Sequence, residues 1–318
     1  ALKRKYRKLY EQLQAKGIAF LRPEIQDANP AALQVFQQTL GDILDAIEDC
    51  AGPDRYIPLF LIDEFTYVYS NIMQPQPGTT INGDFMKFWK GFLEGFPVCA
   101  IVVGMDSMPA FMEAFPNEFA CMKAYHVSFL KEKYARDMAD LPIRLPDGSS
   151  RYAGEAGEAA LDYICELTAG SAYLEAICCK ALVDYLNDHC TTYVTRTVID
   201  NLLQERLLSD ARPILNQTKF DPQINDPGKF GQAEQLAVVQ DNRALLSWMA
   251  SCSDTRHELV AEQLEGLVLS QPEPEYRRQV LARLVDRDVV TKRAERYYKI
   301  KIDLMRRWLL REKGEEFI

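Results

Sequence analysis

The stretch YIPLFLIDEFTYVYS, residues 56–70, decides how the first part of this chain folds. Its apolar run (57–62) is long enough for one buried strand, and it ends in two adjacent carboxylates, Asp63 and Glu64. A second continuous apolar run, PVCAIVVG (97–104), follows a helix-like segment. Strands that are apolar on both faces and alternate with helices indicate a parallel sheet covered on both sides. The first third of the chain is therefore predicted to be α/β.

Helical periodicity surrounds these two strands. We expect helices over 33–47, which Gly52-Pro53 would end, and over 83–96. Before them, residues 2–16 have the pattern of a basic amphipathic helix, and a short strand at 17–25 would follow it. The apolar stripe of that first helix consists of Tyr6, Leu9, Tyr10 and Leu13.

From about residue 151 onward the pattern is helical throughout. Segments at 154–170, 171–190 and 194–209 are joined by short connections, which predicts a small helical bundle, and Thr195 has the position of an N-cap. The stretch LNQTKFDPQINDPGKFGQ (215–232) is polar and rich in Pro, Gly and Asn, so it is the best candidate for a linker.

The C-terminal part has the order of a winged helix-turn-helix. Three helical segments, about 241–251, 257–266 and 273–287, precede an alternating stretch (288–302) that indicates a β-hairpin, and a last helix over 303–312 follows. Between Tyr276 and Glu312 there are twelve Lys/Arg against five Asp/Glu, whereas the whole chain has a net charge of −9. The basic residues are therefore concentrated in this tail.

Composition excludes several classes of protein. The negative net charge argues against a protein that coats nucleic acid indiscriminately. No apolar stretch approaches the roughly 20 residues that span a bilayer, and the N-terminus lacks a signal-peptide core, so we expect a cytoplasmic protein with no membrane partner. The eight cysteines include no C-x-x-C pair, which favours reduced thiols, and Cys178, Cys179, His189 and Cys190 lack the helical spacing of metal ligands. The three histidines are isolated, so no Ser/His/Asp or Cys/His nucleophilic set is visible.

The acidic pair has a chemical interpretation and a plain alternative. Ligands of parallel sheets bind at the carboxyl ends of the strands, where Asp63 would hold Mg²⁺ through water and Glu64 would polarise an attacking water, as in the Walker B arrangement of P-loop nucleotidases. The alternative is an acidic pair that only solvates a strand end. After the second strand, Asp106 or Ser107 has the position of a γ-phosphate sensor, or alternatively of a helix N-cap. A phosphate-binding G-x-x-x-x-G-K-[ST] loop is absent, since the only Gly-Lys pair is Gly228-Lys229 in the linker.

Several segments together resemble bacterial AAA+/STAND-type P-loop ATPases, and more narrowly Orc-like, AAA-like proteins with a helical lid and a C-terminal winged helix. The segments that carry this resemblance are FLIDEF (60–65), AIVVG (100–104), YHVSFLKEKYARDMADLPI (125–143), YICELTAGSAYLEAICCKALVDYLN (163–187), YVTRTVIDNLL (193–203) and LARLVDRDVVTKRAERYYKIKIDLMRRWLL (281–310). The resemblance covers nearly the whole chain from about residue 5. Its most specific parts are the lid and the C-terminal tail.

The resemblance implies a domain plan. Residues 1–145 would be an α/β P-loop NTPase-type core that lacks Walker A, 146–214 an all-α lid, 215–235 a linker and 236–318 a winged helix-turn-helix. Residues 2–16 look like the helix that follows Walker A, so we expect that loop upstream of Ala1. Gly170 would contact the nucleotide from the lid, although Ala172 replaces the usual proline. An arginine finger is not assignable; Lys123 and Arg136 are only guesses.

The expected function is that of an ATP-binding regulatory switch with Mg²⁺, in which nucleotide state moves the winged helix and ATP is hydrolysed if a Walker A loop precedes Ala1. Defence, signalling or DNA transactions are possible settings, with a protein partner or self-association. One alternative is an Orc-like winged-helix DNA-binding protein, and another is an inactive ATPase-fold scaffold. The nucleic-acid candidates are Arg277, Arg278, Arg283, Arg287, Lys292, Arg293 and Arg296. These basic residues would otherwise pair with the acidic remainder of the chain.

Overall fold

The computed structural model describes residues 32–51, 57–73, 83–105, 107–209, 211–225, 232–252, 259–293 and 296–314, together with Glu11 and Ala15. The chain divides into two compact units, unit 1 (Ala1–Ala124) and unit 2 (Tyr125–Ile318). Apart from Glu11 and Ala15, the predicted helix at 2–16 lies outside the described residues, as does the predicted strand at 17–25.

Unit 1 contains a small parallel sheet, as the sequence predicts. Strand β1 (Leu59–Ile62) pairs with β2 (Cys99–Val102), with Leu59 opposite Cys99 and Ile62 opposite Val102. The helices of this unit are α3 (Ala32–Ala51), α4 (Thr66–Met73), α5 (Gly83–Gly95) and α6 (Met108–Ala114). A parallel pair needs a crossover connection, and here α4 and α5 lie within it. The predicted helices at 33–47 and 83–96 are confirmed.

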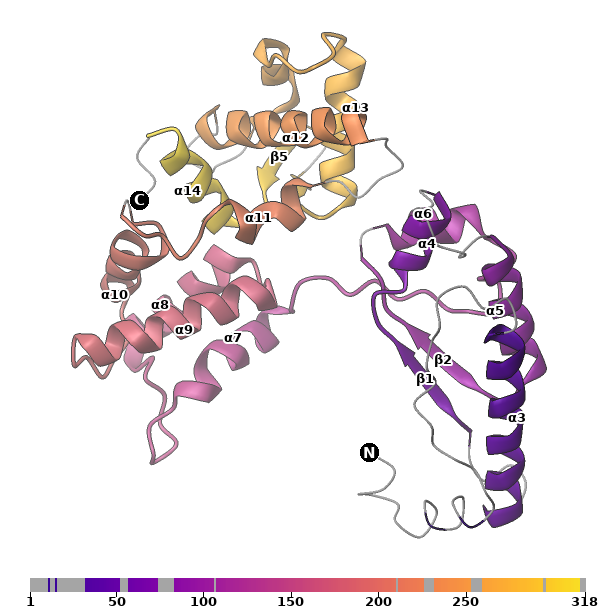
Figure 1. Ribbon diagram of the computed structural model, residues 1–318. Helices are drawn as coiled ribbons and strands as arrows, with labels where there is room; N and C mark the ends of the chain where they lie inside the picture. Colours follow the sequence, from indigo (N-terminus) through magenta and orange to yellow (C-terminus); the bar gives the residue numbers. More distant parts are fainter. Residues whose placement is uncertain are drawn as a thin grey trace. The chain divides into compact units, whose positions relative to one another are not determined.

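The two faces of the β1–β2 sheet have different surroundings. Phe60 packs on an aromatic cluster, with its ring 5.4 Å from the ring of Phe92 and 6.3 Å from that of Phe36. In Figure 1, α3 and α5 lie on this side of the sheet. On the other face, Leu61 is 71% exposed and Ile101 is 53% exposed. Within unit 1, the described residues cover one face of the sheet only, so the prediction that helices cover both faces is not met there.

Unit 2 begins with a bundle of helices. Its elements are α7 (Glu132–Asp140), the 3₁₀ turn η1 (Leu141–Ile143), α8 (Gly154–Thr168), α9 (Ala172–Asp188), α10 (Arg196–Leu202) and the π-helical turn η2 (Leu203–Leu207). The expected N-cap is confirmed, because the Thr195 hydroxyl accepts a hydrogen bond from the Val198 N–H at 3.4 Å. Helix α7 packs against both α8 and α9, so residues before 146 belong to the bundle.

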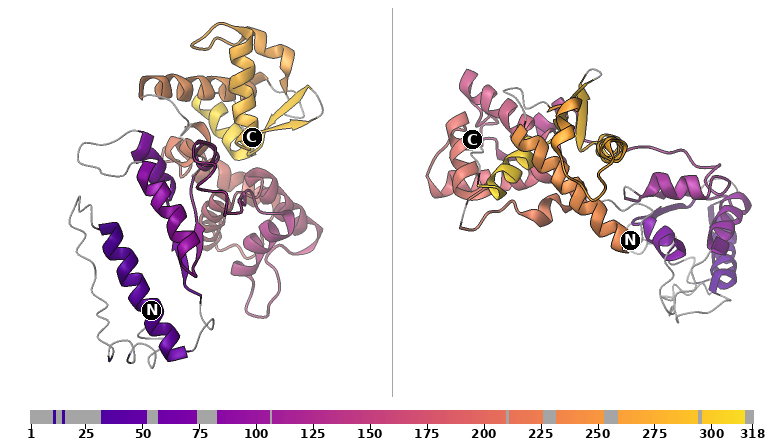
Figure 2. Two further views of the ribbon diagram at one scale, coloured as in Figure 1. Left: turned by 90° about the vertical axis from the view of Figure 1, so that its right-hand side faces the viewer. Right: turned by 90° about the horizontal axis from the view of Figure 1, so that it is seen from above.

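The C-terminal part of unit 2 combines helices with a small antiparallel sheet. Its elements are α11 (Gln217–Ile224), α12 (Gln232–Cys252), β3 (Leu259–Val260), the 3₁₀ turn η3 (Ala261–Gly266), α13 (Pro274–Asp286), β4 (Val290–Arg293), β5 (Tyr297–Ile300) and α14 (Asp303–Glu312). The strand order is β3-β5-β4. The left view of Figure 2 shows β4 and β5 as paired arrows near α14. Where the sequence indicated a helix at 257–266, the described residues form a short strand and a 3₁₀ turn instead.

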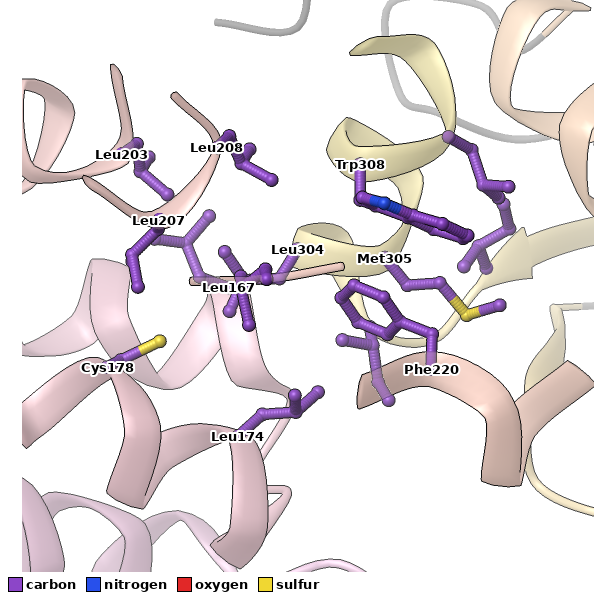
Figure 3. Packing of buried hydrophobic residues seen from close by; sticks show 14 of the residues in the cluster. Leu167, Leu174, Cys178, Leu203, Leu207, Leu208, Phe220, Leu304, Met305 and Trp308 are labelled. Carbon is purple, nitrogen blue, oxygen red and sulfur yellow. The ribbon is translucent and has the colours of Figure 1, made fainter. Parts of the chain in front are cut away.

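One hydrophobic core runs through the whole of unit 2. Trp308 of α14 is fully buried and stacks on Phe220 of α11 with ring centroids 5.0 Å apart. Leu304 belongs to the same cluster as Leu167 of α8 and Leu207 of η2, and Figure 3 shows these side chains together. Helix α14 packs against α8 as well as α12. The bundle helices and the C-terminal elements therefore do not have separate cores.

The segment expected to be a linker contains helix α11. Its Phe220 and Ile224 are buried, one turn apart, on the face that meets the core. The Arg287 guanidinium donates hydrogen bonds to the carbonyls of Pro222 at 2.8 Å and Asn225 at 2.5 Å, which ties the helix end to α13. The polar, Pro-containing composition of this segment gave no indication that it contains a short amphipathic helix. None of the helices in the described ranges is at once long and apolar enough to cross a bilayer.

Candidate functional site

Asp63 and Glu64 lie at the carboxyl end of β1, where the strand turns into α4. Both side chains are exposed. The Glu64 N–H donates to Asp63 Oδ1 at 2.9 Å, and Glu64 has the left-handed φ of 57°. A left-handed conformation in a residue other than glycine costs on the order of 1 kcal/mol, so the rest of the fold must hold this turn in place.

The two residues that follow the acidic pair, Phe65 and Thr66, hold the turn in place. The Phe65 N–H donates to the Val103 carbonyl at 2.8 Å, which extends the strand pairing beyond β1. Phe65 is buried, and its ring stacks on that of Phe111 with centroids 5.7 Å apart. The hydroxyl of buried Thr66 accepts a hydrogen bond from the Met105 N–H at 3.4 Å. The backbone of the acidic pair is thereby fixed against the segment that follows β2.

Gly104 and Thr66 belong to this site, and the sequence analysis did not single them out. A Cβ at Gly104 would lie 2.6 Å from Thr66 Cγ2, so only glycine allows the two segments to approach. Glycine at the end of an apolar strand is a signal of close backbone approach. That signal was available in the sequence at VVGM (102–105).

The two carboxylates at this edge suit a Mg²⁺ ion that keeps most of its bound waters better than a metal bound by protein side chains alone. No group of three or more His, Cys, Asp or Glu that could hold a metal occurs among the described residues. Mg²⁺ usually keeps several waters and binds one or two carboxylates together with substrate phosphates. Asp63 and Glu64 fit that role, because they present two exposed carboxylates on a backbone fixed by Phe65 and Thr66. A phosphate-bearing ligand would have to supply the remaining negative oxygens.

The two residues predicted after the second strand have different outcomes. Asp106 lies outside the described residues. Ser107 is 6% exposed and occupies the N-cap position of α6, where its carbonyl accepts the Phe111 N–H at 2.9 Å. Its hydroxyl makes no capping hydrogen bond. A role for either residue as a phosphate sensor stays a prediction.

Gly170, predicted to contact the nucleotide from the lid, has a structural reason to be glycine. It lies in the turn between α8 and α9 with a φ of 75°, and its carbonyl accepts the Leu130 N–H at 2.7 Å. A Cβ at this position would lie 2.5 Å from the Leu130 carbonyl oxygen. Both the positive φ and the close approach of the chain before α7 require glycine. Nucleotide contact by Gly170 stays a prediction.

The same stretch before α7 also contacts the base of the C-terminal hairpin. The Ser128 hydroxyl donates to Asp288 Oδ2 at 2.6 Å, and Lys301 Nζ lies 3.0 Å from the same oxygen. Lys301 also lies 3.9 Å from the centroid of the Phe129 ring. These hydrogen bonds lower the pKa of Asp288 below its usual range against the opposing effect of burial. Residues 128–130 therefore join the α8–α9 turn to the hairpin base.

The basic candidates divide into two groups. Arg277 donates to the carbonyls of Leu264, Glu265 and Pro272, and it is half-buried together with Arg283 and Arg287. In contrast, the exposed members are Arg278, Lys292, Arg293 and Arg296. The exposed group lies on α13 and on the hairpin, whereas Arg277 and Arg287 stabilise neighbouring turns. Sequence alone could not separate them, because helical spacing does not reveal which carbonyls lie nearby.

Arg136, one of the two residues considered for an arginine finger, has partners within unit 2. It donates to Asp162 and Glu158, both on α8. Arg136 therefore fastens α7 to α8 in this structure.

A buried carboxylate in unit 2 escaped the sequence analysis. Glu175 of α9 is fully buried, and neither of its side-chain oxygens has a hydrogen-bond partner among the described residues. Burial raises the pKa of Glu175 to about 7, and the nearby Thr168 hydroxyl lowers it in part. Burial also raises the pKa of Tyr152, whose hydroxyl has no hydrogen-bond partner among the described residues, and the charge of Glu175 adds to that rise. Glu175 lies on an apolar helix face, where a carboxylate is out of place, and this was the signal available in the sequence.

Comparisons with known proteins show a likeness to a solved structure. A solved structure of the Aeropyrum pernix ORC2 protein, described as ADPNP-ADP complexes, is similar to this chain at 13% sequence identity with a TM-score of 0.49. The similarity covers 97% of this chain and 83% of that chain. No protein-family model and no curated protein matches the chain. A TM-score below one half is too low to argue from, so the chemistry of the site rests on the residues described above.

Proposed function

We propose that this protein is an ATP-binding regulatory switch of the AAA+/STAND type, in which Mg²⁺ and nucleotide bind at Asp63 and Glu64. The observation that supports this best is the pair of exposed carboxylates at the carboxyl end of a parallel strand, held in a strained turn. Strained backbone conformations occur most often at functional sites. An acidic pair that only contacts solvent at a strand end does not require one. Asp63 holds the hydrated metal, and Glu64 orients the attacking water.

The output of the switch is a movement of the C-terminal elements, which we assign to a winged helix. The order helix, short strand, turn, helix and hairpin supports this assignment. Because one core joins these elements to the bundle helices, the lid and the winged helix move as one body. Such a movement requires only that the nucleotide bind one of two conformations of the protein more tightly than the other.

Nucleotide binding and turnover test the proposal. Mg·ATP affinity and hydrolysis are measured for the chain, and for a longer protein if its gene encodes residues before Ala1, with Asp63→Asn and Glu64→Gln in each. We expect Asp63→Asn to remove the Mg²⁺-dependent part of binding. Glu64→Gln should retain binding and lower hydrolysis by about 10² or more, because it removes the group that orients water.

A matched substitution makes this test specific. Glu94→Gln removes an exposed carboxylate of α5, whose only described ion pair is with Lys90 at 3.9 Å. This substitution should leave both the Mg·ATP affinity and the rate of hydrolysis unchanged. Equal Mg·ATP affinity in wild type and Asp63→Asn would overturn the assignment of the metal. Undiminished hydrolysis in Glu64→Gln would remove Glu64 from the catalytic role.

DNA binding is a second candidate function, supported by the exposed basic group on α13 and the hairpin. Arg278, Lys292, Arg293 and Arg296 are all exposed, as phosphate contacts must be. Binding of duplex DNA is measured across salt concentrations, with Lys292→Ala and Arg293→Ala together against Arg196→Ala in the bundle, whose guanidinium lies over the Tyr163 ring. We expect affinity to fall steeply with salt, and the hairpin substitutions to reduce the salt slope by about 2. Affinity that is independent of salt would exclude phosphate contact.

A further inference from the structure

Asp288 follows α13 in a backbone conformation that glycine usually adopts at the end of a helix. Its φ is 63°, and its N–H donates to the Val285 carbonyl at 2.9 Å. The N–H of Val289 donates to the Leu284 carbonyl, also at 2.9 Å. These two hydrogen bonds form the Schellman motif, whose left-handed position is most often glycine. Termination of the helix alone therefore gives no reason for an aspartate here.

The side chain of Asp288 supplies that reason, because it holds the segment that enters unit 2. The Ser128 hydroxyl and Lys301 Nζ both reach Asp288 Oδ2, at 2.6 Å and 3.0 Å. Lys301 follows β5, and its N–H donates to the Val289 carbonyl at 2.9 Å, so these groups lie at the base of the β4–β5 hairpin. Residues 125–131, here called the connecting segment, precede α7 and form neither helix nor strand. Asp288 thereby joins the connecting segment to the hairpin.

Two contacts of different kinds hold the connecting segment. The inner one is the hydrogen bond from the Leu130 N–H to the Gly170 carbonyl, which the close fit of Gly170 against Leu130 supports. The outer one, at Ser128, is open to solvent: the Asp288 side chain is 39% exposed, and Val127 beside Ser128 is 91% exposed. Exposed ion pairs and hydrogen bonds contribute little stability, so the outer contact opens without unfolding the core.

We propose that Ser128, Asp288 and Lys301 form a releasable latch that fixes the connecting segment to the base of the β4–β5 hairpin. Because unit 1 ends at Ala124, a closed latch leaves only residues 125–127 between unit 1 and the hairpin base. An open latch adds residues 128 and 129, which is about 7 Å of extended chain. The latch therefore sets how directly a movement of unit 1 reaches the hairpin. The proposal does not depend on nucleotide binding at the acidic pair.

Proteolysis of the connecting segment tests the latch. Asp288→Gly opens it without adding strain, since glycine readily adopts a positive φ. Ser128→Ala removes the hydroxyl, and Asp288→Asn keeps an oxygen that accepts it. Chymotrypsin cleavage after Phe129 is followed by mass spectrometry, because the half-buried Phe129 ring lies against Lys301 while the latch is closed. We expect cleavage at least about tenfold faster in Asp288→Gly and Ser128→Ala, and a smaller increase in Asp288→Asn.

Cys190→Gly is the matched control. Cys190 has a φ of 50° after α9, where its N–H donates to the Asn187 carbonyl at 3.3 Å and the Thr191 N–H donates to the Leu186 carbonyl at 3.0 Å. This substitution relieves the same strain in the same motif without touching the connecting segment. It should leave cleavage after Phe129 unchanged.

Two results of the proteolysis would overturn the latch. One is unchanged cleavage after Phe129 in either Asp288→Gly or Ser128→Ala. The other is equal acceleration after Phe129 and after Tyr193, which is 51% exposed in the same unit. Asp288 would then support the fold of unit 2 as a whole.

A distance between the two units tests the consequence of the latch. Spin labels are placed on Cys121 in unit 1 and Cys190 in unit 2, with Cys99 replaced by serine, and the distance distribution is measured without nucleotide. We expect Asp288→Gly to broaden this distribution by up to about 7 Å, the length of the two released residues. The same width in wild type and Asp288→Gly would contradict the claim that the latch restricts movement between the units.

Discussion

Leu61 and Leu174 are both leucines in regular structure, but they have opposite environments. Leu61 lies on β1 and is 71% exposed, whereas Leu174 lies on α9 and is fully buried in the core of unit 2. The described part of unit 1 covers one sheet face with aromatic side chains and leaves the other bare. Unit 2 buries apolar side chains from nearly all of its elements in one cluster. The elements of unit 2 therefore share one core, whereas the described residues of unit 1 leave one face of its sheet uncovered.

The largest expected effect comes from removing the Trp308 side chain from the core of unit 2. Its indole stacks on Phe220 and lies 5.6 Å from the guanidinium carbon of Arg243, so it joins α14, α11 and α12. Trp308→Ala should lower the free energy of unfolding of unit 2 by about 3 to 5 kcal/mol. Hydrogen exchange should quicken in α8 and α9 as well as in the C-terminal helices. Faster exchange confined to residues 232–314 would contradict a shared core.

The matched substitution in unit 1 is Trp89→Ala. Trp89 is 4% exposed, and its ring lies 5.4 Å from that of Phe65 behind the acidic pair. The substitution should destabilise unit 1 by a similar amount and leave exchange in unit 2 unchanged. It should also weaken any Mg·ATP binding, because Phe65 helps to hold the turn that carries Asp63 and Glu64.

Glu175→Gln should make the stability of unit 2 less dependent on pH. The pKa of Glu175 in the folded protein, about 7, is above its ordinary value of 4.5, so the folded state binds the proton more tightly. Its contribution is therefore fully present below pH 4.5 and is lost as the pH rises through 7. At about pH 8, Glu175→Gln should raise the free energy of unfolding by roughly 2 to 3 kcal/mol relative to wild type, and the difference should shrink toward about pH 5. Denaturant titrations at the two pH values measure it; a constant difference would argue against the buried charge.

Gly170→Ala should cost more than the same change at Gly148. Both glycines have positive φ, 75° and 84°, but a Cβ would meet the Leu130 carbonyl at Gly170 and nothing within 4 Å at Gly148. We expect about 2 kcal/mol of destabilisation at Gly170 and about 1 kcal/mol at Gly148. Thermal unfolding of the two variants provides the comparison. Equal losses would mean that the chain before α7 does not pack on the α8–α9 turn.

The smallest effects distinguish the two groups of arginines on α13. Arg287→Ala removes hydrogen bonds to the carbonyls of Pro222 in α11 and of Asn225 just after it, and should destabilise unit 2 by about 1 to 2 kcal/mol. Arg278→Ala removes only an exposed pair with Glu275 at 3.3 Å and should cost at most about 0.5 kcal/mol. If α13 contacts DNA, the ranking of the two for DNA affinity should be reversed. Identical stability losses would contradict the structural role of Arg287.

Local sequence patterns predicted the helices and strands well where one residue period dominated. The spacing of apolar residues in 33–47 and 83–96 gave two helices, and the continuous apolar runs gave the parallel strands. The pattern failed at α11, where two buried residues lie within a polar segment. It also could not show that α14 packs on α8. The apolar periodicity of a helix shows which of its faces is buried, but it does not show which distant element covers that face.

The candidate site was predictable only in part. Asp63 and Glu64 could be placed at a strand end from the sequence, because an apolar run that stops at two charges has few other structural solutions. The strained turn at Glu64 and the contact of Thr66 with Gly104 depend on backbone geometry that no composition reveals. Arg277 looked like its exposed neighbour Arg278 in sequence, since its carbonyl partners come from a different turn.

The central claim is that nucleotide at the acidic pair moves unit 2 as one body. Two distances measured by electron spin resonance test it, each in a chain whose other exposed cysteines are replaced by serine. One is between labels on Cys121 in unit 1 and Cys190 in unit 2. The other, within unit 2, is between Cys190 and a label introduced by Val268→Cys, a position that is 87% exposed. Both are measured with and without Mg·ATP. We predict that the first distance changes, that Asp63→Asn abolishes the change, and that the second distance stays constant. A change in the distance between positions 190 and 268 would contradict the account.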